Sequence, residues 1–268
     1  EWDLWLGPAP EIPFTPNLHP FNWRGWWDYG TGALGDVGCH LMDIPFRMLG
    51  LQYPLDAECS VGSVYSQMWT PDFNPAGCPA SSFITLHYGP TGKNGVPLEM
   101  TWMDVGIRPS HPDIIPADHD LGGANSANGV MMIGEKGIIT HNINDSSPLM
   151  PKLYLYDGTK EFGPDRIEGT EPEYGHQRKW VDACKAGFGS TEHKGLTSSF
   201  DYAGPMTETV LMGNLAIRSY MLRRPNSKGQ QEFFGRRKLL WDGENMRITN
   251  LEEANQFVGR TYRAGFEV

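Results

Sequence analysis

The chain has 268 residues, and its 39% hydrophobic content is enough for a globular core. Its 32 acidic and 22 basic residues give a net charge of −10, and because no dense Lys/Arg run is present we expect no nucleic-acid partner. No apolar run is long enough to span a membrane, and the N-terminus has neither a basic n-region nor an apolar h-region, so we expect no membrane partner and no signal peptide.

The cysteines are scattered along the sequence, with no Cys-x-x-Cys pair. This spacing favours buried thiols over a zinc site or a disulfide framework, and we expect no bound metal. The cellular compartment stays open between cytoplasm and periplasm. The cysteines are Cys39, Cys59, Cys78 and Cys184.

Residues 1–30 are rich in Pro, Trp and Gly and predict an irregular lead-in without a long helix. Residues 55–157 contain short strand-like runs with no helix between them, which predicts one large, open, mainly antiparallel sheet. Helical patterns follow at 173–187 and 198–224, and Asn250 with Glu253 predicts a capping box at a last short helix. The expected fold class is therefore α+β, a two-layer fold with helices packed on one face of the sheet.

The stretch "YGTGALGDVGCHLMDIPF" joins a glycine-rich turn to a polar pattern. If the chain is helical from Gly35 onward, Asp36, His40 and Asp43 lie on one face, beside an apolar stripe that begins at Val37. Pro45 should kink this helix just beyond the three polar residues. A histidine flanked by carboxylates is typical of a general acid/base, but also of a metal-ligand pair or a solvated helix face.

Other residues near this stretch are candidates for binding a substrate. Trp23 and Trp27 offer flat faces on which a sugar ring can stack, although tryptophans more often belong to the core. Arg24 is a candidate substrate or cofactor contact, with cation–π packing as the alternative. His176 lies on the predicted helix 173–187, where an interhelical hydrogen bond is the alternative to a substrate contact.

A further polar loop follows the expected strands between residues 108 and 129. It could line a polar substrate or hold a cation, but without typical ligand spacing a solvated loop is favoured. Its polar residues are His111, Asp113, Asp118, His119 and Asp120.

Several blocks, in order, resemble one known family. They are "WDLWLGPAP", "NWRGWWDYGTGALGDVGCHLMD", "GVMMIGEKG", "FDYAGPMTETVLMGNLAIR" and "LLWDGENMRITNLEEAN". They look like the C-terminal part of the glucose-fructose oxidoreductase / inositol dehydrogenase / MocA (Gfo/Idh/MocA) family, nearest to a bacterial branch. The resemblance implies a two-domain enzyme: a Rossmann domain that holds NAD or NADP, and a sheet domain that covers the cofactor and often forms a homo-oligomer.

The resemblance also implies roles for individual residues. The family's Asp-x-x-x-His pattern matches Asp36 and His40, with the histidine as acid/base and the aspartate as its orienting partner. Asp43 matches a frequent substrate-binding carboxylate. Some members of this branch carry a twin-arginine export signal.

The sequence departs from the family pattern because no G-x-G-x-x-G follows an opening strand. We therefore expect residues 1–268 to be a single C-terminal domain, beginning where the family's Rossmann domain would end. NAD or NADP would be held mainly by that other domain, with at most nicotinamide contacts near Gly32 and Gly35. This chain alone should be inactive.

Three functions stay open at this point. The first is the substrate-binding and catalytic half of an NAD(P)-dependent oxidoreductase acting on a CH–OH group of a sugar, cyclitol or related polyol. The second is glycoside cleavage through transient oxidation by the same cofactor. The third is a non-catalytic carbohydrate-binding or oligomerisation module. We expect a homo-oligomer formed through the sheet.

Overall fold

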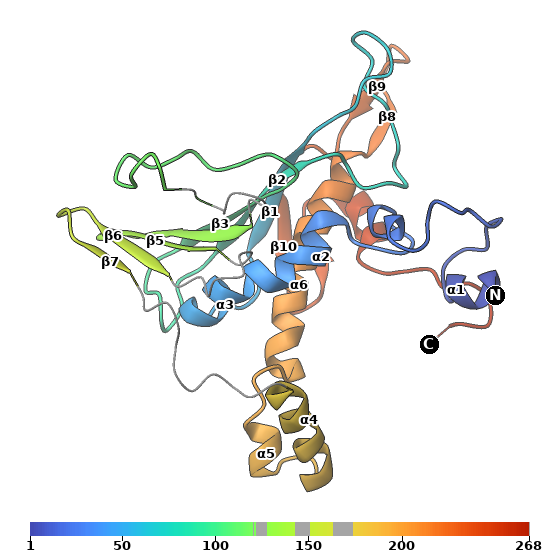
Figure 1. The fold of residues 1–268 in the computed structure, drawn as a ribbon. Coiled ribbons are helices and arrows are strands. Elements are labelled where there is room, and N and C mark those ends of the chain that lie inside the picture. Colours follow the sequence, from blue (N-terminus) through green and yellow to red (C-terminus); the bar gives the residue numbers. More distant parts are fainter. Residues whose placement is uncertain (120, 122–127, 143–150, 163–173, 268) are drawn as a thin grey trace. The chain divides into compact units, whose positions relative to one another are not determined.

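The computed structural model describes residues 1–119, 121, 128–142, 151–162 and 174–267 (Figure 1). They divide into two compact units. Unit 1 contains residues 1–109 and 206–268, and unit 2 contains residues 110–205. The expectation of a single domain over 1–268 stays a prediction.

Unit 1 is built on a five-stranded antiparallel sheet with the order β11-β10-β1-β2-β3. The strands are β1 (Asp56–Val61), β2 (Ser82–Tyr88), β3 (Leu98–Met103), β10 (Leu239–Asp242) and β11 (Arg247–Ile248). A separate hairpin pairs β8 (Arg223–Pro225) with β9 (Gln231–Phe233). The helical elements are α1 (Trp2–Leu6), η1 (Asn22–Gly25), α2 (Gly32–Leu41), α3 (Asp43–Leu49), α6 (Phe200–Tyr220, of which the part from Met206 belongs to this unit) and η2 (Glu252–Phe257).

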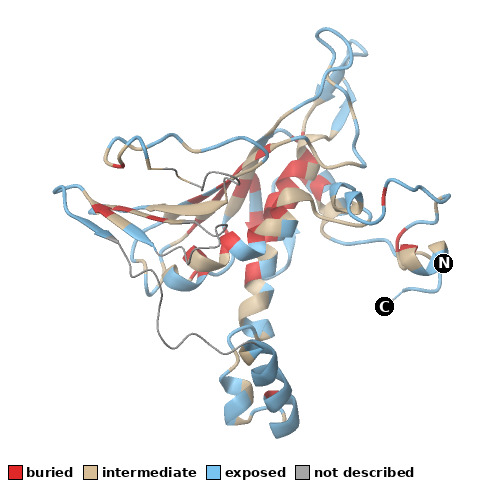
Figure 2. Ribbon diagram, in the orientation of Figure 1, coloured by how far each residue is buried: buried red, intermediate tan, exposed pale blue. Residues whose placement is uncertain are grey.

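One face of the five-stranded sheet is covered by α2 and α6. Burial alternates along β3, where Met100 and Trp102 are buried while Glu99 and Thr101 are exposed. Helix α6 comes so close that a β-carbon at Gly213 would lie 2.6 Å from Leu34 of α2 and 3.5 Å from Ile84 of β2. Glycine therefore permits close helix–helix and helix–sheet contact here, and buried residues gather along this part of α6 and the sheet (Figure 2).

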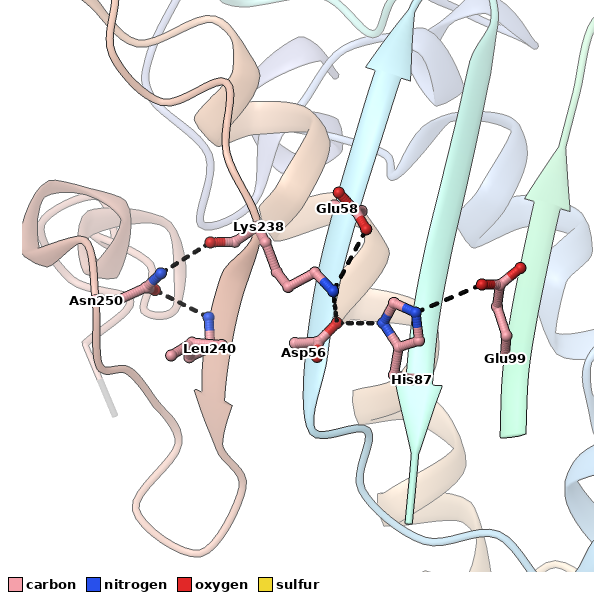
Figure 3. Close-up of polar contacts among 7 residues, drawn as sticks. All are labelled: Asp56, Glu58, His87, Glu99, Lys238, Leu240 and Asn250. Atoms are coloured by element: carbon pink, nitrogen blue, oxygen red, sulfur yellow. Dashed lines mark hydrogen bonds and ion pairs between the residues drawn. The ribbon is translucent and has the colours of Figure 1, made fainter. Parts of the chain in front are cut away.

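The other face of the same sheet carries a row of polar side chains on β1, β2 and β3, and Lys238, just before β10, joins this row (Figure 3). His87 Nδ1 contacts Asp56 of the neighbouring strand, and its Nε2 lies 3.5 Å from Glu99 on the other side. Lys238 Nζ lies 3.6 Å from Asp56 and 3.5 Å from Glu58. These cross-strand pairs follow from the register, which places Asp56, His87 and Glu99 opposite one another.

Unit 2 contains a four-stranded antiparallel sheet with the order β4-β5-β6-β7. Its strands are β4 (Gly129–Ile133), β5 (Gly137–Asn142), β6 (Lys152–Leu155) and β7 (Lys160–Phe162), and its helices are α4 (Gly175–Ala186) and α5 (Thr191–Lys194). Ile115, Ile138 and Tyr154 form a small core. The polar loop predicted after residue 108 contributes to this core through Ile115, and His119 Nδ1 lies 2.9 Å from the Tyr154 hydroxyl. Asp120 lies outside the described residues.

The structure confirms the mixed α/β fold with mainly antiparallel sheets, but the strand-like runs of residues 55–157 do not form one sheet. They divide after β3, where residues 104–128 contain several prolines and glycines. One edge of β1 pairs with β2, and the other edge pairs with β10 from the C-terminal part of the chain. Local alternation predicted the strands, but it holds no information about which distant strand pairs with which.

Asn250 has a different role from the predicted helix cap. Its amide nitrogen donates to the Lys238 carbonyl at 2.8 Å, and its side-chain oxygen accepts from the Leu240 N–H at 2.9 Å (Figure 3). The helical segment η2 begins beyond Leu251 and has no side-chain cap. The capping-box prediction is wrong because an Asn amide can donate and accept at once, and here it satisfies both groups at the start of β10.

Candidate functional site

Asp36 and His40 lie on α2, four residues apart, and both side chains are exposed. Residues at this spacing are neighbours on a helix surface. The helix does not continue to Asp43 as predicted: α2 ends at Leu41, and α3 begins at Asp43. Pro45 has no N–H to donate to the carbonyl of Leu41, so the break falls ahead of Asp43 rather than beyond it.

Arg24 is the ion-pair partner of Asp36. Its Nε lies 3.1 Å from the Asp36 carboxylate, and the two side chains are 31% and 43% exposed. The guanidinium carbon lies 4.4 Å from the Phe21 ring centroid and 4.5 Å from that of Trp23. Packing against two rings restricts the guanidinium, so Arg24 can hold the Asp36 carboxylate in one orientation although an exposed pair adds little stability.

The glycine-rich turn before α2 is packed by the chain itself. A β-carbon at Gly30 would lie 2.6 Å from the Arg24 backbone. Gly32 has φ +67, and a β-carbon there would lie 3.0 Å from Cys78 Sγ, while a β-carbon at Gly35 would overlap Thr31. Internal packing therefore explains these glycines, and the nicotinamide contacts expected near Gly32 and Gly35 stay a prediction.

A small pocket of about 20 Å³ lies beneath this turn, with room for roughly a single water molecule. Its lining includes Thr31, Gly32, Cys78, Asp104 and Ile217. Asp104 accepts hydrogen bonds from the Ser82 hydroxyl at 2.6 Å and the Trp102 indole N–H at 2.9 Å. Burial raises the pKa of the Cys78 thiol to about 12, so this thiol is neutral at physiological pH.

The tryptophans predicted to stack on a sugar have structural partners in the chain. The Trp23 indole N–H donates to the Pro20 carbonyl at 3.1 Å. Trp27 lines the small pocket, and the Arg218 guanidinium carbon lies 5.7 Å from its ring centroid. Both rings remain partly exposed, so each has surface that a ligand can reach.

The remaining candidates are placed differently. Asp43, in the first turn of α3, is partly buried. His176 is exposed on α4, which belongs to unit 2, whereas Asp36 and His40 belong to unit 1. Within the described ranges, no three His, Cys, Asp or Glu side chains form a group that could hold a metal ion.

Sequence reasoning missed the residues beneath the turn. Asp104 directly follows β3, and Arg218, half-buried near the end of α6, packs on the Phe257 ring at 4.4 Å from its centroid. Burial lowers the pKa of Arg218, while Asp28 opposes this shift. A carboxylate at the end of a buried strand was the signal available for Asp104, whereas nothing local marked Arg218.

Two comparisons with known proteins bear on this site. No curated protein matches the chain. Residues 1–62 match the family model described as "Oxidoreductase family, C-terminal alpha/beta domain". This segment contains α2, with Asp36 and His40, and Arg24 with the neighbouring tryptophans, but not His176. None of the helices in the described residues has the length and apolar character needed to cross a membrane. Residues 1–62 are therefore similar to the C-terminal alpha/beta domain of an oxidoreductase family, which is consistent with the resemblance to Gfo/Idh/MocA proteins seen in the sequence.

Proposed function

We propose that this chain is the substrate-binding and catalytic half of an NAD(P)-dependent oxidoreductase that acts on a CH–OH group of a sugar, cyclitol or related polyol. The observation that carries the proposal is the pair Asp36 and His40, exposed one turn apart on α2 within the matched segment. Trp23, Trp27 and Asp43 are the proposed substrate contacts around this pair, because apolar ring faces and carboxylates suit polyhydroxylated ligands.

His40 is the proposed acid/base. When an alcohol is oxidised, its hydroxyl proton must leave as the carbonyl forms, and an imidazole exchanges protons readily near neutral pH. The proposed role of Asp36 is to orient His40 or to accept a hydrogen bond from a neighbouring hydroxyl. Arg24 supports this role because it fixes the Asp36 carboxylate from the side of the glycine turn.

NAD or NADP would supply the hydride acceptor or donor for this reaction. A dinucleotide does not fit beneath this turn, because Cys78 and Thr31 occupy the space at Gly32 and Gly35 and the pocket there holds about 20 Å³. We therefore propose that a separate nucleotide-binding domain holds the cofactor. The residues of this chain provide substrate binding and proton transfer.

Carbohydrate binding by the purified chain tests the proposal. Saturation-transfer NMR with a panel of hexoses, cyclitols and their glycosides should detect weak binding of at least one class. Asp36→Asn together with His40→Ala should weaken this binding, while Cys39→Ser, a neutral change on the same helix, should leave it intact. Equal binding by the double variant would remove α2 from the site, and no binding by the wild type would contradict the proposal.

We also propose that the protein forms a homo-oligomer through the open face of its five-stranded sheet. Beside the polar row, this face carries Leu240, which is 45% exposed. An antiparallel sheet covered on one face leaves the other available for a partner.

A further inference from the structure

Two segments of unit 1 that are far apart in the sequence form one surface, here called the arm: residues 62–81 and 221–238. They lie side by side beyond the end of β1 and β2 (Figure 1). The Phe73 ring packs edge-on against Phe233 with 6.4 Å between centroids, and the Arg223 guanidinium carbon lies 3.4 Å from the Phe73 centroid. The β1–β2 connection is thus attached to the β8–β9 hairpin.

The tip of the arm is ordered and apolar. Asp72 accepts from the backbone N–H of Ser66 at 3.2 Å, and its own N–H donates to the Val64 carbonyl at 2.7 Å. This closed turn presents Met68 and Trp69, which are 82% and 88% exposed. Trp69 has φ +62, a backbone conformation that is rare for a bulky residue. Large apolar side chains held in solvent by an ordered turn usually mark an interaction surface.

The arm is positively charged in an acidic protein. It contains six basic residues and two acidic residues, so it carries +4 while the remainder of the chain carries −14. The basic residues are Arg223, Arg224, Lys228, Arg236, Arg237 and Lys238. A surface of this sign is complementary to the acidic remainder of the same chain.

The geometry of the arginines distinguishes a protein partner from a phosphate-rich one. Besides Arg223, Arg224 packs 4.6 Å from the Phe234 centroid, and Arg236 lies 3.7 Å from that of Phe233. These guanidiniums contact ring faces of their own chain instead of extending outward as a series of phosphate contacts would need. Trp, Tyr, Phe, Met and Arg are also the residue types enriched in protein–protein interfaces.

We propose that the arm binds a second copy of this chain, with its Met68–Trp69 tip and stacked arginines lying against an acidic surface of the partner molecule. This inference concerns assembly and does not rest on the oxidoreductase activity proposed above. Carbohydrate binding is measured separately, so either proposal can fail while the other holds.

Sedimentation equilibrium of the full chain at micromolar concentration tests the arm with two independent double variants. Met68→Ala with Trp69→Ala removes the apolar tip, and Lys228→Glu with Arg237→Glu reverses two charges. Each should raise the dissociation constant of the dimer at least about tenfold, as expected for loss of interface hot spots. Added salt should weaken the wild-type dimer, because the attraction includes an electrostatic part.

Matched controls lie outside the arm. Phe188→Ala removes a ring that is 96% exposed, and Lys185→Glu reverses an exposed charge on α4; neither should change the dissociation constant. Circular dichroism verifies that each variant is folded. A wild-type monomer, or dimers unaffected by both arm variants, would overturn the proposal. So would a monomer whose arm binds vesicles of anionic lipid or heparin, because the arm would then serve a polyanion.

Discussion

His40 and Asp36 lie together on exposed α2, so their roles can be separated by single substitutions. In the proposed oxidoreductase, assembled with the proposed nucleotide-binding domain, His40→Ala should lower turnover at least about a hundredfold, because general acid/base catalysis contributes that much or more. Asp36→Asn should act in the same direction, since an amide does not stabilise a protonated imidazole as a carboxylate does. Steady-state kinetics with a separate cofactor titration measures both effects, with Cys39→Ser as control. An equal loss of cofactor affinity would contradict the assignment.

The thiols differ in reactivity for a physical reason. Burial raises the pKa of Cys59 and Cys78 from 9.0 to about 12, whereas Cys39 and Cys184 are exposed. Because the thiolate is the reactive form, iodoacetamide at pH 8 should modify Cys39 and Cys184 in the native protein. Cys59 and Cys78 should react only after unfolding. Intact-mass and peptide mass spectrometry check this, and rapid native labelling of Cys78 would show that the turn over it opens.

The same two thiols link stability to high pH. Their folded pKa values lie above the unfolded one, so the unfolded chain loses these protons first as pH rises. Their stabilising contribution is complete below pH 9 and is lost progressively towards pH 12. Urea unfolding of the Cys59→Ala, Cys78→Ala double variant should therefore depend less on pH between about 9 and 11 than that of the wild type.

Between elements, Glu208 of α6 and Trp241 of β10 make a hydrogen bond of 2.6 Å. Burial raises the pKa of Glu208, and the Trp241 hydrogen bond partly offsets this shift. Glu208→Gln keeps an acceptor for the indole and removes a partly buried charge, so it should stabilise the fold at pH 7. This advantage should shrink on acidification, because wild-type Glu208 becomes neutral as pH falls through its raised pKa.

Glu208→Ala is the matched variant for that hydrogen bond. It leaves the Trp241 N–H, in a side chain only 9% exposed, without its acceptor. The expected loss in unfolding free energy is about 1–3 kcal/mol by urea denaturation. If the Ala and Gln variants are equally stable, the indole finds another partner and the bond does not connect α6 to the sheet.

Predictions from sequence succeeded where a pattern is local. Alternation along β3 and helical periodicity in α4 and α6 were sufficient, because each depends on neighbouring residues. The strand order was missed because it includes the pairing of Asp56 with Leu240, 184 residues later. The break between α2 and α3 followed from Pro45, but sequence alone did not show on which side of Asp43 it would fall.

The sequence predicted the helix face of the candidate site but not its tertiary contacts. The spacing of Asp36 and His40 identified an exposed helix face, and the structure adds the pairing of Arg24 with Asp36. That pair joins a 3₁₀ turn to a helix across a glycine loop, and its geometry depends on Gly30 packing against the Arg24 backbone. Contacts that depend on such tertiary packing leave no periodic pattern in the sequence.

For the whole molecule, light scattering after size exclusion should give a mass at least twice 30.0 kDa at micromolar concentration. Leu240→Arg places a charge on the open sheet face and should favour the monomer if this face is an interface. Leu4→Arg, at a residue 72% exposed on α1, is the control. A variant mass equal to that of the wild type would exclude the sheet face as an interface.

Calorimetric titration tests where the cofactor is held. Pyrophosphate binding in Rossmann enzymes depends on a glycine turn at a helix N-terminus after a strand, which this sequence lacks. The purified chain should bind NAD(H) and NADP(H) no more tightly than about millimolar, which corresponds to about 4 kcal/mol. A micromolar dissociation constant would place a nucleotide site within these residues.

The strand order of the five-stranded sheet matters during protein synthesis. One edge of β1 pairs with β10. The backbone groups along this edge therefore stay unpaired until the ribosome has made about 180 further residues. At roughly 5–20 residues per second, this takes on the order of 10–40 s. Throughout that time a nascent chain presents an unpaired strand edge to its neighbours on the same messenger RNA. The sheet therefore completes late, and until β10 is made the exposed edge of β1 is a site at which nascent chains can associate.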